Sequence, residues 1–347
     1  MTAQRTVRIV LVGLGNLGRR FLELVAAKDA MLRSTYGLHL RVVGVADSRG
    51  TARDAAGLDL SALIGMKAAG GTVGDYPARG VRGAAALELL ETIEADVLCE
   101  ASPVHLEAGG EPGLSCIRTA LSRGLHVVTP NKGPIVLAYS ELTALAARHG
   151  VCLRFDGTVA GGLPAIGLGR RELRGATIER IEAVPNLVTG LVLDLLAAGV
   201  GWEAAIERVQ GEGVLEADPD WDLDGWDAAA KLVILANAVL GMPARLENVR
   251  REGIRGVSLE RAQRAAKRGE KLRLVALARR AADGGYALRV APQALRPDHP
   301  LGHLGPKAMG IVYETDIYGT ITASIVEETP VPSAATILRD LLDILVE

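Results

Sequence analysis

The chain has 347 residues, enough for two domains with buried cores. Its 39 Lys and Arg residues are balanced by 41 Asp and Glu residues, so the chain lacks the basic excess typical of nucleic-acid binding. Aromatic residues make up only 3%, which argues against a site that stacks sugars on aromatic rings. The three cysteines form no CxxC pair, which argues against a disulfide framework or a zinc site. No signal-peptide pattern opens the sequence, and the apolar stretch 187–202 is too short and interrupted to span a bilayer. We therefore expect a cytoplasmic protein that binds neither membrane nor nucleic acid.

The first 155 residues alternate short β-branched runs with longer helical patterns, which is typical of βαβ units and a parallel sheet. The pattern predicts strands over 7–12, 41–46, 96–100, 126–129 and 151–155. It predicts helices over 16–30, 113–123 and 139–149, and Gly124 and Gly150 follow two of them as expected for helix ends. This region is therefore predicted to be an α/β domain with a Rossmann-type, doubly wound parallel sheet.

The pattern changes after residue 155, where the Gly-Gly-Leu-Pro segment 161–164 breaks the rhythm. We expect a buried helix over 187–202 and a last helix over 333–346 that returns to the first domain. Predicted strands lie over 177–185, 286–292, 308–316 and 320–327. These strands suit a mixed sheet in a second, α+β domain.

A glycine-rich loop joins the first predicted strand to the first predicted helix. Its GxGxxG pattern permits a tight turn, lets a pyrophosphate approach the backbone, and places that group at a helix N-terminus. A bare GxGxxG is weak, but the strand before it and the helix after it support a dinucleotide site. We predict that the cofactor contacts Gly13, Gly15, Asn16, Leu17 and Gly18.

The cofactor type depends on the segment after the second predicted strand, which contains Asp47, Ser48 and Arg49. An acid at this place hydrogen-bonds a ribose hydroxyl and favours NAD, whereas an arginine pairs with a 2'-phosphate and favours NADP. Lys67 is a further candidate phosphate partner. Asp47 comes later than the usual spacing, which we ascribe to an insert around residues 33–39. The choice between NAD and NADP stays open.

The segment 216–227 contains six acids ahead of an apolar helical run. Asp227 and Lys231 are four residues apart, so they share a helix face and the carboxylate can orient the ammonium. Such pairs commonly lie on solvated faces, where they contribute only about 0.3–0.5 kcal/mol. Here the nearest neighbours of Lys231 are apolar, which favours a position in a cleft.

Two further segments point to a ligand site. Residues 129–132, Thr-Pro-Asn-Lys, follow a predicted strand at the carboxyl edge of the sheet, where open α/β folds bind ligands. Residues 156–164 form a glycine-rich hinge whose carbonyls can line a site or hold a cation. Taken singly, a helix-capping turn explains the first segment better, and an interdomain bend explains the second.

Together these blocks resemble the homoserine dehydrogenase family over nearly the whole chain. The most specific block is E-x-D-P followed by D-L-x-G-x-D-x-x-x-K, which runs here from Glu216 to Lys231 without an insertion. The resemblance implies a nucleotide-binding domain over 1–155 completed by 328–347, and a catalytic and dimerisation domain over 156–327. It also implies a homodimer of the short, monofunctional form, with no room for a fused kinase or regulatory domain.

The resemblance implies an NAD(P)-dependent oxidoreductase that interconverts L-homoserine and L-aspartate 4-semialdehyde, in threonine and methionine biosynthesis. Lys231, held by Asp227, would donate and accept the proton, as a lysine can in a water-poor site. Lys132 would assist at the same oxygen. This mechanism requires Lys132 and Lys231 to face one pocket.

The resemblance also implies the substrate and cofactor contacts. Glu216 would bind the substrate ammonium, with Asp227 beside it, and Asp222 would position that group or Lys231. Ser102 and Lys132 complete the predicted cofactor contacts.

Three blocks depart from the family pattern. Asp156 stands where the family usually has Glu, in a site for a monovalent cation (Na or K) that would use Asp156 and the carbonyls of Val159, Gly161 and Leu163. Residues 185–192 replace an N-G-T-x-N-Y-I-L block, and residues 327–330 replace a glycine-rich turn beside the nicotinamide. Two alternatives therefore stay open: a related dehydrogenase of another small amino or hydroxy acid, and a nucleotide-sensing protein with impaired catalysis.

Overall fold

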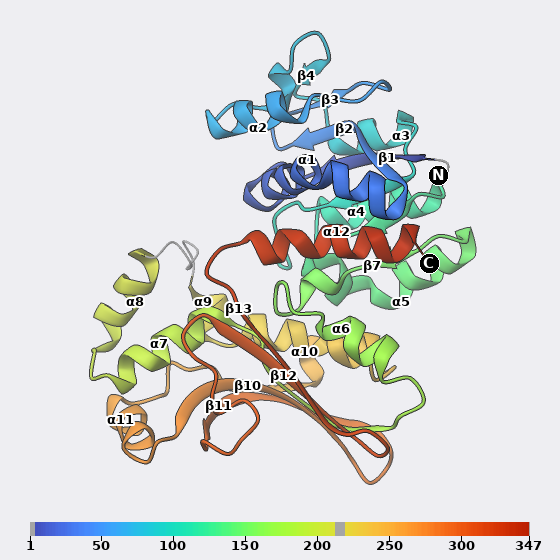
Figure 1. Cartoon of the computed structure of the whole chain (residues 1–347). Helices are drawn as coiled ribbons and strands as arrows, with labels where there is room; N and C mark the ends of the chain where they lie inside the picture. The colour runs from blue at the N-terminus through green and yellow to red at the C-terminus, as the bar shows by residue number, and fades with distance from the viewer. Residues whose placement is uncertain (1–3, 212–218, 347) are drawn as a thin grey trace. The chain divides into compact units, whose positions relative to one another are not determined.

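The computed structural model describes residues 4–211 and 219–346 (Figure 1). The chain divides into two compact units, one formed by residues 1–162 with 329–347 and the other by residues 163–328. Across the described ranges, no helix is both long enough and apolar enough to cross a membrane.

The first unit is built on a seven-stranded sheet with the order β4-β3-β2-β1-β5-β6-β7. Its strands are β1 (Arg5–Val12), β2 (Leu38–Asp47), β3 (Gly50–Arg53), β4 (Gly80–Arg82), β5 (Val97–Glu100), β6 (His126–Val128) and β7 (Leu153–Arg154). The strands from β2 to β7 in this order run parallel, whereas β3 and β4 form an antiparallel edge. Because β1 lies between β2 and β5, the loop after β1 lies where the strand order reverses, which is where such sheets bind ligands. The predicted Rossmann-type sheet is confirmed.

Helices and short turns complete the first unit: α1 (Asn16–Tyr36), α2 (Leu60–Ala68), η1 (Val73–Asp75), α3 (Ala86–Thr92), α4 (Gly113–Ser122), α5 (Lys132–His149), η2 (Asp156–Thr158) and α12 (Val331–Leu345). The last helix, α12, lies beside α1 (Figure 1). Its buried side chains Ile337, Leu338 and Leu341 join those of β1 and α1 in one apolar core. The predicted return of the C-terminal helix to the first domain is therefore confirmed.

Two helices are longer than predicted. α1 continues past residue 30 to Tyr36, because no residue breaks the helix before Gly37, which has a left-handed φ of +66°. The late position of Asp47 thus reflects a longer helix. α5 begins at Lys132 rather than at 139, and the non-helical Ala138 (φ −137°) interrupts the periodicity inside it.

The second unit contains a six-stranded sheet with the order β13-β12-β8-β10-β11-β9. Its strands are β8 (Ile178–Val184), β9 (Val249–Arg251), β10 (Lys271–Arg280), β11 (Tyr286–Leu295), β12 (Ala308–Thr315) and β13 (Gly319–Val326). Among the described strands of this sheet, only β9 and β11 pair in parallel, so the sheet is mixed as predicted.

The helices and short turns of the second unit are α6 (Ala165–Gly167), η3 (Leu168–Glu172), α7 (Leu187–Ala197), α8 (Trp202–Gly211), α9 (Asp220–Leu223), α10 (Trp226–Ala238), η4 (Leu246–Asn248) and α11 (Leu259–Lys267). The single helix predicted over 187–202 is wrong at its end: α7 stops at Ala197, and Gly199 has a positive φ of +91° before α8 begins. α10 packs against β9, β10 and β11 and is buried along most of its length.

Candidate functional site

The loop between β1 and α1 has the shape of a phosphate-binding turn. A Cβ on Gly13 would lie 2.3 Å from the backbone carbonyl of Ala101, and one on Gly18 would lie 2.2 Å from the Gly13 oxygen. By contrast, a Cβ on Gly15 would meet nothing within 4 Å. Gly15 caps α1 without a side-chain hydrogen bond, and the first turn contains no acid. The loop therefore leaves open space at a helix N-terminus, which fits a dinucleotide pyrophosphate.

Asp47, at the end of β2, is fully engaged by donors of its own unit. One carboxylate oxygen accepts hydrogen bonds from the Arg49 backbone N–H (2.9 Å) and the Thr72 hydroxyl (2.8 Å). The other accepts from Lys67 Nζ (2.8 Å) and the Val73 backbone N–H (3.0 Å). Burial alone would raise the pKa of Asp47, but the bonds from Lys67 and the other donors outweigh it and lower the pKa. All four acceptor positions of the carboxylate are used.

The neighbouring Arg49 and Ser48 are exposed. Arg49 donates from Nη2 to the carbonyls of Gly70 (2.9 Å) and Gly71 (2.7 Å), which fixes its side chain at the end of β2. Lys67, anchored on Asp47, keeps 17% of its side chain exposed. Two cations thus lie near the end of β2, where a 2'-phosphate binds in this fold.

A buried polar network, absent from the prediction, lies at the ends of β5 and β6. Glu100 is fully buried and accepts from the Ser102 backbone N–H (2.8 Å), the Ser102 hydroxyl and the Thr129 hydroxyl (2.9 Å). Burial raises the pKa of Glu100. The backbone N–H and the hydroxyl of Ser102, a predicted cofactor contact, therefore both donate to the buried Glu100. The available signal was an acid ending an apolar strand, Val-Leu-Cys-Glu.

The segment 129–132 links this network to α5. Asn131 caps α5 by accepting from the Gly133 N–H at 3.0 Å, as expected for a helix-capping turn. Lys132 is half-buried and is the first residue of α5. The capping turn therefore sets where the Lys132 side chain leaves the helix.

In the second unit, Lys231 lies in a cluster of buried polar groups. Its Nζ donates to Asp227 at 2.8 Å and to the Pro185 carbonyl at 2.7 Å. Only 6% of the Asp227 side chain and 15% of the Lys231 side chain are exposed. The pair thus shares a helix face, as the spacing predicts, and that face is not solvated.

Asn186 connects this cluster, and the sequence reasoning missed its role. Its side-chain amide donates to Asp222 and to Asp227, at 2.6 Å in each case, while its oxygen accepts from the Thr189 N–H and caps α7. One side chain thereby fixes the starts of α7, α9 and α10 relative to one another. The available signal was an asparagine directly before an apolar helix.

Other predicted site residues cannot be joined to this cluster. Glu216 lies outside the described residues. Lys132 belongs to the first unit and Lys231 to the second, so their convergence on one pocket stays a prediction.

The hinge at the end of the first unit contacts α12. Arg339 donates from Nη2 to Asp156 (3.0 Å) and from Nη1 to the Gly162 carbonyl (2.9 Å). The Thr336 hydroxyl lies 3.1 Å from the Gly161 carbonyl, and Asp340 accepts from the Asp156 N–H at 2.9 Å. Burial, together with the charge of Asp156, raises the pKa of Asp340 to about 7.

The other predicted cation ligands are backbone carbonyls. Val159 belongs to the hinge, whereas Leu163 opens the second unit, where its carbonyl accepts from the Ala165 N–H at 2.8 Å. Of the predicted set, Asp156 and Gly161 thus already accept hydrogen bonds from α12.

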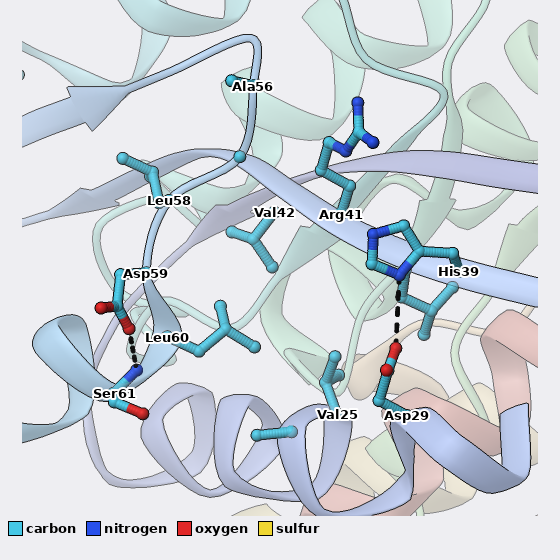
Figure 2. A pocket seen from close by; sticks show the side chains of 13 residues that line it. Val25, Asp29, His39, Arg41, Val42, Ala56, Leu58, Asp59, Leu60 and Ser61 are labelled. Carbon is cyan, nitrogen blue, oxygen red and sulfur yellow. Dashed lines mark hydrogen bonds and ion pairs between the residues drawn. The ribbon is translucent and has the colours of Figure 1, made fainter. Parts of the chain in front are cut away.

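A cavity of about 400 Å³ lies between α1, β2 and the segment before α2 (Figure 2). Several of its polar lining groups are bonded within the protein: His39 lies 3.3 Å from Asp29, and Asp59 accepts from the Ser61 N–H at 2.8 Å. It includes none of the predicted site residues. This cavity is therefore separate from the glycine loop.

Comparison with known families covers both units. A family model described as homoserine dehydrogenase matches residues 164–342, and one described as the NAD binding domain of homoserine dehydrogenase matches residues 13–156.

Individual relatives match over nearly the whole chain. An NAD(+)-dependent homoserine dehydrogenase of Pseudomonas canavaninivorans is 32% identical over 97% of this chain and 96% of its own length. A homoserine dehydrogenase of Methanocaldococcus jannaschii is 33% identical over 97% of this chain and 98% of its own.

Solved structures agree. A putative homoserine dehydrogenase from Archaeoglobus fulgidus superposes with a TM-score of 0.86 at 31% identity, covering 98% of this chain and 100% of that one. A hyperthermophilic archaeal homoserine dehydrogenase in complex with NADPH gives a TM-score of 0.84 at 30% identity, covering 98% of each chain.

Proposed function

Because the chain belongs to the homoserine dehydrogenase family, we propose that Lys231 is the proton donor and acceptor in its NAD(P)-dependent interconversion of L-homoserine and L-aspartate 4-semialdehyde. A proton must leave or reach the substrate oxygen as the carbon is oxidised or reduced. The bound nicotinamide supplies the hydride acceptor or donor. The observation that carries this proposal is the ion pair of Lys231 with Asp227, which is largely removed from solvent.

The contacts of Lys231 suit this role. Asp227 and the Pro185 carbonyl hold the ammonium in one orientation, which lowers the entropic cost of aligning it with the substrate oxygen. A charged ammonium is the form that gives a proton to the alkoxide formed on aldehyde reduction. We propose that Lys132 assists at the same oxygen.

We propose that carboxylates bind the substrate ammonium. Asp222 and Asp227 are linked through the Asn186 amide, so two carboxylates are held near Lys231 in fixed positions. Glu216 would supply the third, as the family pattern implies. Asn186 acts as a positioning residue, since it contacts both acids.

For the cofactor we propose a preference for NADP over NAD. Asp47 already accepts four hydrogen bonds, so a ribose hydroxyl would have to displace one of them. Arg49 and Lys67 offer positive charge at the end of β2, with Ser48 beside them, which suits a 2'-phosphate. Gly13, Gly15, Asn16, Leu17 and Gly18 would bind the pyrophosphate.

We further propose that the protein works as a cytoplasmic homodimer on a small-molecule substrate. β13 is an edge strand of the six-stranded sheet, and Val326 at its end is 60% exposed. Exposed apolar edges are commonly covered by a partner. The molar mass of the purified protein can be measured by light scattering, and a value equal to that of one chain would contradict the dimer.

The proton-transfer role is tested with two matched variants, Lys231→Met and Lys271→Met. Both lysines lie in the second unit, and both donate to one backbone carbonyl at 2.7 Å, but the described structure gives only Lys231 a carboxylate partner as well. With homoserine and NADP, formation of reduced cofactor should fall by about 100- to 10,000-fold in Lys231→Met and stay near the wild-type rate in Lys271→Met. Equal rates in the two variants would contradict the assignment.

A further inference from the structure

We propose that Arg339 supplies the positive charge of the hinge over 156–162, and that this hinge therefore binds no Na⁺ or K⁺. The guanidinium joins a carboxylate to a carbonyl: one terminal nitrogen bonds Asp156 and the other bonds the Gly162 oxygen. A cation site built on this hinge would use the same carboxylate. The family-implied ligand set and the contacts present in this chain therefore disagree.

One face of α12 matches the hinge group by group. Thr336, Arg339 and Asp340 are spaced i, i+3 and i+4, so their side chains lie on the same side of the helix. The Thr336 hydroxyl lies within hydrogen-bond distance of the Gly161 carbonyl and of the Pro332 carbonyl of its own helix, and Asp340 accepts from the N–H of Asp156. Asp156, Gly161 and Gly162 are thus paired with complementary groups of α12 rather than directed at an ion.

The chemistry of the donor set also opposes a bound ion. A monovalent cation needs several oxygen lone pairs pointing at it, whereas a guanidinium carries five N–H donors and no acceptor. Arg339 Nε is buried and, among the described residues, bonds no acceptor, so the spare polar atom here is a donor. A second positive charge beside the guanidinium would also be repelled by it.

The guanidinium has a different consequence from an exchangeable ion. It is covalently part of α12, so it cannot be diluted away or exchanged for another cation. It therefore holds the hinge to the C-terminal helix of the same unit without depending on which alkali ion is present.

The experiment measures ion binding directly. Thermal unfolding of the full chain is followed in KCl, in NaCl and in choline chloride at equal ionic strength, and crystals are soaked in RbCl to locate Rb⁺ by anomalous scattering. For the wild type we expect equal midpoints in the three salts and no anomalous peak at Asp156. A peak on the Asp156 carboxylate, or a midpoint raised only by K⁺ or Na⁺, would overturn the proposal.

The variant Arg339→Met keeps an unbranched apolar stem and removes the guanidinium with its charge, which frees the Asp156 carboxylate for an ion. K⁺ at about ten times its Kd should then raise the folded-to-unfolded ratio about elevenfold, a midpoint increase of roughly 2–4 °C. A folded Arg339→Met that gains no K⁺ effect would contradict the proposal, because the hinge would then need no cation. If this variant does not fold, the wild-type measurements still decide.

Arg123→Met is the matched control. Arg123 also donates to backbone carbonyls of the first unit, Leu90 and Ile93, but without a carboxylate in the described contacts. This variant should lose stability equally in KCl and in choline chloride. Ion binding is read here without turnover, so failure of the proposed proton transfer by Lys231 would leave the result on Arg339 unaffected.

Discussion

Removing the charges of Lys231 and Asp227 singly and together separates their structural role from the catalytic role that we propose for them. Loss of one partner of a buried ion pair typically costs about 3–5 kcal/mol of unfolding free energy. Lys231 keeps 15% of its side chain exposed, and Asn186 still donates to Asp227, so we expect about 2–3 kcal/mol for Lys231→Met. The double variant with Asp227→Asn leaves no unpaired charge. Its stability should return to within roughly 1 kcal/mol of wild type.

Unlike stability, catalytic activity should not recover in the double variant. Lys231→Met and the double variant both lack the proposed proton donor, so kcat/KM should stay about 100- to 10,000-fold below wild type in both. Urea unfolding is followed by tryptophan fluorescence, which reports the second unit because Trp202, Trp221 and Trp226 all lie there. Recovery of activity together with stability in the double variant would refute the assignment and leave Lys231 a structural role only.

Three other changes test the first unit. Arg49→Met should lower kcat/KM with NADP by about 10- to 100-fold and leave NAD turnover nearly unchanged, whereas Arg53→Met, on the neighbouring β3, should alter neither. Gly15→Val should keep the wild-type melting temperature but weaken NADP binding in calorimetry, since its side chain would enter open space; Gly13→Ala should lower the melting temperature as well. Because the folded-state pKa of Asp340 is raised from 3.8 to about 7, the folded chain keeps a proton that the unfolded chain releases. Stability should therefore fall as pH rises between about 4 and 7, by at most roughly 4 kcal/mol, and urea titrations should show this loss to be absent in Asp340→Asn.

Much of the fold follows from local pattern. The β-branched runs and the glycines after helices predicted the parallel strands of the first unit and most strands of the second, because strand formation and helix ends depend on nearby residues. The errors lie where local signals are weak. α1 continues to Tyr36 because its last turns contain no helix-breaking residue before Gly37. The first turns of α5 were not predicted because the non-helical Ala138 interrupts the helical periodicity.

The site was predictable where its chemistry is local in sequence. The four-residue spacing of Asp227 and Lys231 correctly placed them on one helix face, and the glycine loop has its own strand and helix around it. Asn186 is 41 residues from Asp227, so no spacing could pair them. Asp47 shows the same limit, because Lys67 and Thr72, which occupy its carboxylate, lie 20 and 25 residues further on.

The hinge shows why a motif alone does not determine what it binds. Residues 156–164 fit the family pattern with one carboxylate shortened, and a pattern describes only the oxygens that the segment can offer. Whether those oxygens contact an ion or a side chain depends on α12, which begins 175 positions after Asp156. No local sequence pattern covers such a separation. Arg339 is 183 residues from Asp156, yet its guanidinium provides the charge that the carboxylate requires. A buried, ionised carboxylate is costly unless it is paired, and at Asp156 the pairing charge comes from a distant side chain of the same unit.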